Sequence, residues 1–525
     1  MVTLRLITCI QYATIHFCYA MAVEFISYNP INATRNAAKT DGHVILGGLF
    51  PIHNHNEQNS ISPCGTLNHE RGIHRLEAMF YACDLINQNR KLLPNFTVGV
   101  EIRDTCGVAT YALEEAVPFV IGSLDYHRGT CAINKGNRIQ GVIGAASSSI
   151  SIQIANLLRL FQVPQVSYAS TSPDLNDRKR FEYFLRTVPP DTYQARAMID
   201  IIKHFNWTSV HGIYSEGNYG QKGMDKFREH AQKNNICLIS ASLVNGKSNF
   251  VALLRNLAMF KNTHVVVLFL STDHIQLLLD GASKVNGQFK FKWLASEYWG
   301  TRIRFMSDVN LRKAADGAIT LTLETKSVQG YVNYFKNLTV YNNKRNPWFA
   351  RFWEETFNCT FSSTFLSKRK MCIGNESLPD NYKFDDKVPY VLDAVLAMGH
   401  ALDSVLPSKC DDQLKACGLP FLKGSSLLKA LNNISYNGTL GPVKFDENGS
   451  TVREYEIMEF IDGEYRKVGK WLNSLSEMAE LKKPTHSFCA VPCPPGEIKT
   501  PKNGLICCYK CKRCTSKHYA SGETT

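Results

Sequence analysis

The chain has 525 residues, which is too long for a single hydrophobic core, so we expect two or more domains. Its apolar content of 44% and charged content of 20% exclude a disordered protein. The net charge is +13, but lysine and arginine are scattered along the chain, and we therefore expect no nucleic-acid partner.

The N-terminus has the pattern of a secretory signal peptide over residues 1–22, with a mostly apolar stretch and an Ala20-Met21-Ala22 cleavage site. Seventeen cysteines and nine Asn-x-Ser/Thr sequons also indicate an oxidising, secretory route and a glycoprotein. No later run of 18 or more apolar residues is present, so we expect this chain by itself to be secreted. The sequons begin at Asn32, Asn95, Asn206, Asn337, Asn358, Asn375, Asn433, Asn437 and Asn448.

A buried strand over 43–50 and an amphipathic helix over 71–89 are the first predicted elements. The loop between them carries His53, Asn54 and His55, which lack further ligands at suitable spacing, so we predict no metal site there. The residues that the helix turns inward include a buried thiol, and they are Ile73, Leu76, Met79, Phe80, Cys83 and Ile86. A strand over 95–104 and a helix over 108–121 follow.

A βαβ unit over 139–172 places hydroxyl groups at the ends of two strands. An apolar strand over 139–145 is followed by Ser147–Ser149 and a helix, and a second strand over 166–169 ends in Ser-Thr-Ser. Ligands of open α/β sheets sit at such strand ends, and helix N-termini favour anions such as a carboxylate. The alternative, which these residues alone favour, is that the serines only cap a helix.

The chain from 184 onward continues the alternation of strands and helices. Asp191 and Gln194 fit a capping box in front of a helix that runs to residue 204. Strands over 209–215, 237–243, 264–270, 291–296 and 318–324 alternate with helices, which predicts parallel sheets with right-handed crossovers. Residues 41–325 suffice for two such sheets, and a helix is expected over 388–405.

The C-terminal tail is rich in cysteine. Six cysteines fall between residues 489 and 514, which in a secreted chain indicates a disulfide module. Zinc is the alternative for the C-x-x-C of Cys508 and Cys511.

Several long stretches resemble the extracellular part of class C G-protein-coupled receptors, most closely the metabotropic glutamate receptors. They include GIHRLEAMFYACDLIN (72–87), VIGAASSSISIQIANLL (142–158), YASTSPDLND (168–177), FLRTVPPDTYQARAM (184–198) and NWTSVHGIYSEGNYG (206–220). The resemblance covers about 41–514 and implies an α/β, bilobed Venus-flytrap fold, periplasmic-binding-protein-like, with a mostly parallel sheet in each lobe. It implies a first lobe from 41–188 and 325–445, a second lobe from 189–324 and 446–484, and the start of a disulfide-rich domain over 485–525.

The resemblance also implies a ligand set. Ser148, Thr171 and the backbone of Ala169 would hold the α-carboxylate of an amino acid, and Asp191 and Tyr219 its ammonium group. Arg75 and Lys387 match the two cations for a distal carboxylate, although without the resemblance both would be read as surface residues.

Two departures from the family pattern concern this site. The family's usual Asp-Gly-Trp is Glu297-Tyr298-Trp299 here, and the resemblance implies that Glu297 contacts the ligand at its amine end. A methylene is added at Glu297 and a glycine is replaced at Tyr298. A family aromatic residue after Cys106 is Gly107. L-Glutamate is the leading ligand, and another amino acid is the alternative.

The family's disulfide pattern would pair most of the cysteines and leave Cys83, Cys131 and Cys514. Cys131 would form an intersubunit disulfide in a homodimer, and Cys514 would lack a partner if the chain is cut short. The implied pairs are Cys64–Cys106, Cys359–Cys372, Cys410–Cys417, Cys237–Cys507, Cys489–Cys508 and Cys493–Cys511.

The predicted function is that of an extracellular amino-acid sensor at the plasma membrane. Ligand-driven closure of the lobes would signal through a dimer to a G protein by way of a membrane domain that this chain lacks. We expect no cofactor, no metal and no enzyme activity, since the serine run lacks a G-x-S-x-G elbow. A soluble decoy and a receptor subunit without ligand are the alternatives.

Overall fold

The computed structural model describes residues 37–56, 62–127, 139–285, 290–301, 308–361, 369–406, 422–482, 485–490, 493–502 and 505–514. The signal peptide, Cys131 and the Cys410–Cys417 pair lie outside these ranges, and those predictions stay predictions.

The first sheet has six strands in the order β1-β5-β2-β6-β7-β8. All pair in parallel except β1, which is antiparallel to β5. All seven residues of the central strand β2 are buried, as its apolar sequence predicts. The strands are β1 (Ala38–Thr40), β2 (Val44–Phe50), β5 (Val98–Asp104), β6 (Ile139–Ile143), β7 (Gln165–Ser167) and β8 (Phe184–Arg186).

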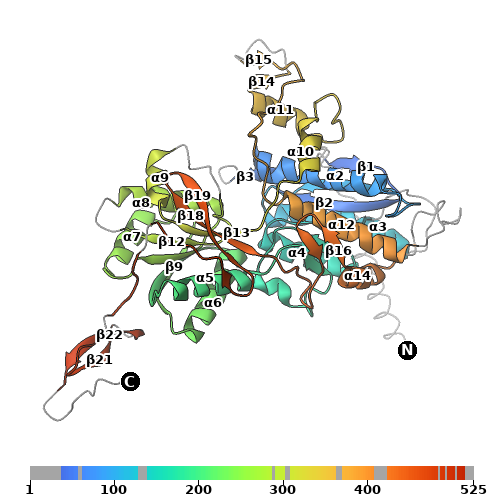
Figure 1. Ribbon diagram of the computed structural model, residues 1–525. Helices are drawn as coiled ribbons and strands as arrows, with labels where there is room; N and C mark the ends of the chain where they lie inside the picture. The colour runs from blue at the N-terminus through green and yellow to red at the C-terminus, as the bar shows by residue number, and fades with distance from the viewer. Residues whose placement is uncertain are drawn as a thin grey trace, which may run out of the picture. The chain divides into compact units, whose positions relative to one another are not determined.

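Helices cover both faces of this sheet. On one face α12 (Val388–Val405) packs beside α2 (Arg75–Gln88), although about 300 residues separate them in the sequence (Figure 1). On the other face lie α3 (Ala109–His127) and α4 (Ser148–Leu160). The six residues predicted to face inward on the first helix are all buried. That helix, however, begins with a π-helical turn, η1 (His69–His74), before α2.

The second sheet has eight strands in the order β10-β9-β11-β12-β13-β18-β19-β20. Its first five strands pair in parallel, and β18 and β19 add antiparallel pairs that bring residues after 454 back to this sheet. The strands are β9 (Ser209–Ser215), β10 (Cys237–Val244), β11 (Val265–Phe269), β12 (Lys292–Ala295), β13 (Ile319–Leu323), β18 (Tyr455–Ile461), β19 (Glu464–Trp471) and β20 (Leu475–Ser476). The predicted α/β fold with two mostly parallel sheets is confirmed.

Helices also sandwich the second sheet. One face carries α5 (Asp191–His204) and α6 (Asn218–Lys233). The other carries α7 (Phe250–Ala258), α8 (Thr272–Lys284) and α9 (Val309–Ala315). We refer to each sheet with its helices as the first and the second lobe.

The remaining elements are short. They are β3 (His53–His55), β4 (Cys64–Leu67), η2 (Pro173–Asn176), α10 (Gln329–Lys336), α11 (Phe349–Phe357), β14 (Cys359–Thr360), β15 (Lys370–Met371), α14 (Gly424–Asn433), β16 (Tyr436–Gly438), β17 (Gly441–Val443), β21 (Glu497–Lys502) and β22 (Leu505–Arg513). Within the described ranges, no helix combines the length and the hydropathy that a membrane span requires.

Four of the implied disulfides are present: Cys64–Cys106, Cys359–Cys372, Cys489–Cys508 and Cys493–Cys511. The zinc alternative for the tail is wrong, because both cysteines of its C-x-x-C are in disulfides. Cys237 is also disulfide-bonded, but the side chain of Cys507 is not described. Cys83 is a buried free thiol as predicted, and Cys514 is free.

A buried ion pair fixes α12 to the segment that leads into β18. Arg453 donates to Asp393 at 2.9 Å, and their side chains are 4% and 0% exposed. Asp393 also accepts from the backbone N–H and the hydroxyl of Thr439. Breaking one partner of such a pair leaves the other charge buried without compensation.

We therefore expect Asp393→Asn to lower the free energy of unfolding by roughly 3–5 kcal/mol. Urea unfolding followed by circular dichroism measures this loss. Asp380→Asn is the control, because Asp380 is fully exposed and 3.5 Å from Lys336, and it should change stability by about 0.5 kcal/mol or less. Equal losses in the two variants would contradict the prediction.

Candidate functional site

A cavity of about 720 Å³ lies where the carboxyl ends of strands from both sheets meet. Ligands of open α/β sheets occupy this position. Five of the residues predicted from the sequence line it: Arg75, Ala169, Tyr219, Glu297 and Lys387. The other three, Ser148, Thr171 and Asp191, are buried and do not line it.

The serine run joins two strand ends rather than capping a helix. Ser147 stands at the N-cap position of α4 without a side-chain cap hydrogen bond. The hydroxyl of Ser148 instead accepts the backbone N–H of Ser172, which follows β7, at 3.1 Å. The cap-only interpretation is therefore wrong, and the two hydroxyl-bearing segments of the βαβ unit lie against each other as predicted.

Two buried oxygen atoms beside these segments have no hydrogen bond of good geometry among the described residues, although the Thr171 hydroxyl is near enough to Asp191 to lower the pKa of that acid. They are Thr171 Oγ1 and Asp191 Oδ2, on residues that are each 0% exposed. The two residues are adjacent, because the backbone N–H of Asp191 donates to the carbonyl of Thr171 at 2.7 Å. Buried polar atoms without a good hydrogen bond are rare in proteins, and these two suit a ligand that offers a donor to the carboxyl oxygen and an acceptor to the hydroxyl.

The predicted capping box at Asp191 is wrong. Asp191 is the first residue of α5 and Pro190 its N-cap, so no side chain caps this helix. Gln194 turns its amide to donate to Asp191 Oδ1 at 2.6 Å instead of bonding the backbone. Burial, together with the charge of Glu297, raises the pKa of Asp191 to about 8.

An aromatic pair forms the second-lobe wall of the cavity. The rings of Tyr219 and Tyr298 lie 4.3 Å apart, and the hydroxyl of Tyr219 donates to Ser296 at 2.8 Å. Tyr298, the residue that replaces the family's glycine, therefore fills space beside the cleft with its ring.

Arg75 is buried, so its interpretation as a surface residue is wrong. It is 3% exposed, and its guanidinium donates two hydrogen bonds to Asp385, at 2.8 and 2.9 Å. Burial alone would lower the pKa of Arg75, but the Asp385 charge raises it above its usual value. Neutral His74, whose pKa burial lowers to about 3, accepts the Asp385 backbone N–H at 3.2 Å and orients this acid.

Lys387 also has a carboxylate partner, and that partner comes from the other lobe. Its Nζ lies 2.8 Å from Glu297 Oε2, and the two side chains are 13% and 5% exposed. Both cations that the resemblance assigns to a distal carboxylate are thus paired within the chain.

The sequence analysis missed two residues that line the cavity and reach across the lobes. Arg71 donates to Thr272 at 2.5 Å, and Asn218 donates to Asp174 at 2.7 Å. The sequence could have indicated Arg71 as a cavity residue, because Arg71 lies one helical turn before Arg75 and therefore on the same side of the helix. Nothing in the sequence pattern marks Asn218, whose Oδ1 is buried without a partner among the described residues.

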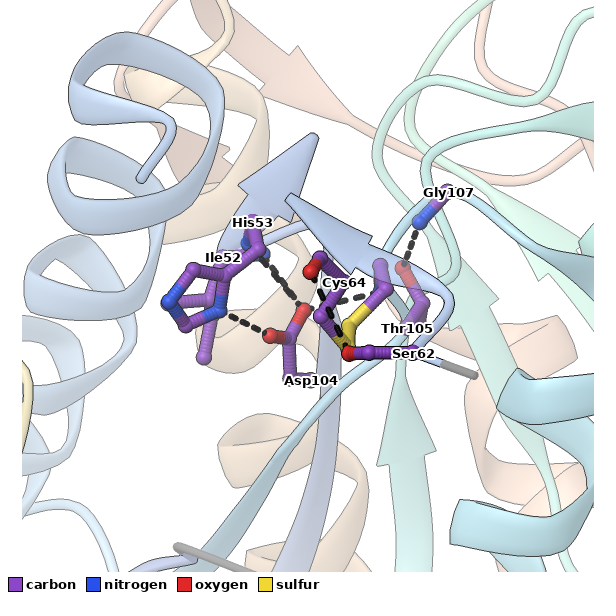
Figure 2. The surroundings of a disulfide bond; sticks show 8 residues. Ile52, His53, Ser62, Cys64, Asp104, Thr105 and Gly107 are labelled. Carbon is purple, nitrogen blue, oxygen red and sulfur yellow. Dashed lines mark hydrogen bonds and ion pairs between the residues drawn. A yellow bond between two sulfur atoms is a disulfide. The ribbon is translucent and has the colours of Figure 1, made fainter. Parts of the chain in front are cut away.

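The Cys64–Cys106 disulfide lies near His53 and Gly107, two residues that line the cavity (Figure 2). Beside it, Asp104 accepts from the ring of His53 at 2.5 Å and from the backbone N–H groups of Ile52 and Cys106. Gly107 lines the cavity with φ +68°, a conformation that favours glycine over the aromatic residue of the family.

Metal binding finds no support in the part of the chain that the structure describes. The three groups of His, Cys, Asp or Glu with suitable spacing each contain disulfide-bonded cysteines, whose sulfur atoms are not thiolates.

Comparison with known proteins identifies relatives over most of the chain. The family model described as "Receptor family ligand binding region" matches residues 74–463. The chain is 38% identical over 517 residues to metabotropic glutamate receptor 8 of Rattus norvegicus and of Homo sapiens, which covers 93% of the chain and 56% of each relative. It is 38% identical over 514 residues to metabotropic glutamate receptor 4 of Macaca fascicularis, which covers 92% and 56%. The chain thus spans about half the length of these relatives, all named as receptors.

The pKa of Asp191 predicts how one part of the stability depends on pH. Its folded-state value of about 8 lies above the ordinary 3.8, so near neutral pH the folded protein holds a proton that the unfolded chain releases. The contribution of Asp191 is therefore complete below about pH 4 and is lost as the pH rises through about 8. Urea unfolding between pH 5 and 9 should show a difference between native protein and Asp191→Asn that declines with pH. Parallel curves would contradict this assignment.

Proposed function

The chain belongs to the receptor ligand-binding family, among the metabotropic glutamate receptors, and on that premise we propose that it is the amino-acid-sensing part of such a receptor. L-Glutamate is the first candidate ligand. The observation that carries the proposal is the buried carboxyl oxygen of Asp191, which has no hydrogen bond of good geometry among the described residues and lies beside a cavity formed by both lobes. Once Asp191 has released its proton, an ammonium group is the partner that suits this oxygen.

The two poles of an amino acid fit opposite walls of the cavity. Its carboxylate accepts hydrogen bonds at the Ser148 and Thr171 strand ends and from the backbone of Ala169, where the N-terminus of α4 adds a favourable field. Its ammonium group meets Asp191 and the ring of Tyr219, which together offer a charge and a π face.

The distal end of the ligand lies toward Arg75 and Lys387. Each of these cations already has a carboxylate partner, Asp385 and Glu297 respectively. A glutamate side chain can share the guanidinium or the ammonium with these partners, and an amino acid with an uncharged side chain leaves both pairs intact. This end of the cleft therefore supports the alternative of a different amino acid.

Closure of the lobes is the proposed signal. Lys387–Glu297, Arg71–Thr272 and Asn218–Asp174 all join one lobe to the other, so they exist only when the lobes are together. A ligand that contacts both lobes shifts the population toward that state by its differential affinity. In the whole receptor, a membrane domain outside this chain would pass the change to a G protein across the plasma membrane.

The proposal predicts that the full chain, secreted from animal cells, binds one or a few of the twenty amino acids in a calorimetric screen. Asp191→Asn should weaken that binding by about tenfold to a hundredfold, because a charge-assisted hydrogen bond to the ammonium is lost. Affinity should also rise between pH 6 and 8, because Asp191 must release its proton before it can pair with an ammonium.

Asp177→Asn is the control for this experiment, because Asp177 accepts backbone N–H groups on the exposed side of η2 and does not line the cavity. If no amino acid binds, or if Asp191→Asn binds as tightly as native protein, the proposed function is wrong.

A homodimer is the second part of the proposal. Among the side chains of α3 and α4 that the structure describes, on one face of the first sheet, three large apolar ones are exposed: Val117 (43%), Ile121 (50%) and Leu160 (74%). Exposed apolar groups of this kind on neighbouring helices suit contact with a second copy. Cys131 would then form the intersubunit disulfide.

We expect Cys131→Ser to remove the covalent dimer on a non-reducing gel while sedimentation still detects a non-covalent dimer. Adding Ile121→Asp should yield monomers, since a charge placed in an apolar interface is costly. A native protein that runs as a monomer on the non-reducing gel would contradict the assignment of Cys131.

A further inference from the structure

The Lys387–Glu297 ion pair spans the cleft from one lobe to the other. Lys387 is the N-cap residue of α12 in the first lobe, and Glu297 follows β12 in the second. Their Nζ and Oε2 atoms are 2.8 Å apart, and both side chains are largely shielded from water. The Lys387 ammonium also lies 5.0 Å from the ring centroid of Tyr390, which fixes its direction.

Glu297 is held in place by its own lobe. Its backbone N–H donates to Gln194 Oε1 at 2.9 Å, and Gln194 in turn donates to Asp191. Glu297 therefore lies close to a second acid, and its charge is one cause of the raised pKa of Asp191. The Glu297 side chain is 5% exposed in the pair, and if Lys387 were drawn away its carboxylate would lie beside Asp191 without a counter-ion, which is costly.

This arrangement changes what the cleft can recognise at the far end of a ligand. A distal carboxylate must either displace Glu297 from Lys387 or share the ammonium with it, and two carboxylates at one ammonium repel each other. A side-chain amide of the same length carries no charge, so it leaves the ion pair between Glu297 and Lys387 in place. Arg75 adds less than a free guanidinium would, because two of its five N–H groups already donate to Asp385.

We propose that Glu297 is a specificity-determining residue that reduces the preference of the cleft for an acidic side chain, so that amino acids with uncharged polar side chains also bind. L-Glutamine is the reference ligand, because it differs from L-glutamate only in the distal amide. The inference rests on the proposed amino-acid binding and concerns only the side-chain end of the ligand.

The test compares the affinities of L-glutamate and L-glutamine by calorimetry on the full chain. Both ligands require the same closure, so their affinity ratio cancels any effect of a variant on closure itself. Native protein should prefer glutamate by less than about tenfold, and Glu297→Gln should raise that preference by about tenfold or more, the size of a charge-assisted hydrogen bond. Lys387→Gln should bring the ratio near one.

The double variant, E297Q with K387Q, distinguishes an effect of Glu297 through Lys387 from an effect of Glu297 on the rest of the cleft. Glu297 is proposed to act through Lys387, so the double variant should show the ratio of K387Q alone. Glu229→Gln is the charge-matched control, because Glu229 pairs with Lys226 and Lys233 on the surface of α6. It should leave the ratio as in native protein. Glu297→Asp, one methylene shorter, should shift the affinity ratio in the same direction as E297Q by a smaller factor. It replaces E297Q as the test variant if E297Q does not fold.

Three outcomes would overturn the inference. The first is a native preference for glutamate above about a hundredfold, and the second is an unchanged ratio in both E297Q and E297D. In either case, binding that Asp191→Asn weakens leaves the proposed function standing. The third is that native protein binds neither ligand nor any other amino acid, which overturns the inference and the proposed function together.

Discussion

The site depends on one constraint: a charge enclosed between two lobes must find a partner when water is excluded. Arg75 meets this constraint inside the first lobe through Asp385, and Lys387 meets it across the cleft through Glu297. Asp191 does not meet it, because one of its oxygens has no hydrogen-bond partner among the described residues. Burial and the nearby Glu297 charge accordingly raise the pKa of Asp191. Asp191 thus differs from Arg75 and Lys387 because it avoids an uncompensated buried charge by holding a proton near neutral pH.

The segment between β8 and α5 links this acid to the rest of the fold. Arg186, which is fully buried, donates to the carbonyls of Ser170 and Ser172 and to the hydroxyl of Ser450. One guanidinium therefore holds the strand end that bears Thr171 against the chain segment that returns to the second sheet. The backbone N–H of Asp191 donates to the carbonyl of Thr171. A change in the angle between the lobes would therefore move the segment after β7 that carries Thr171. This mechanical connection agrees with the proposal that ligand contact and closure are coupled.

Much of the fold follows from local pattern, because apolar periodicity and turn residues act over short stretches of chain. The strand over 209–215 and the helix over 388–405 have the bounds that the sequence predicts, and Ser148 and Ser172 meet because parallel strands end at the same edge. The partners of the charged groups could not be predicted in this way. Asp385 lies 310 residues from Arg75, and Glu297 lies 90 residues from Lys387, so only the tertiary structure brings them together. The sequence pattern also did not predict the π-helical turn before α2, because the residues of this turn have an ordinary helical pattern.

The capping box at Asp191 shows why local rules fail at this site in particular. The spacing of Asp191 and Gln194 is that of two residues that satisfy backbone donors at a helix start. Here the Gln194 side chain bonds at both ends to other groups, donating to the Asp191 carboxylate and accepting from the backbone of Glu297. The helix start is thereby left without a side-chain cap, and the acid is aligned with the second-lobe strand end instead. The local contact, a side-chain cap at the start of α5, is absent, and Gln194 instead joins Asp191 to Glu297, about 100 residues away in the sequence. Such a choice is expected where the residues serve a binding site and not the stability of a helix.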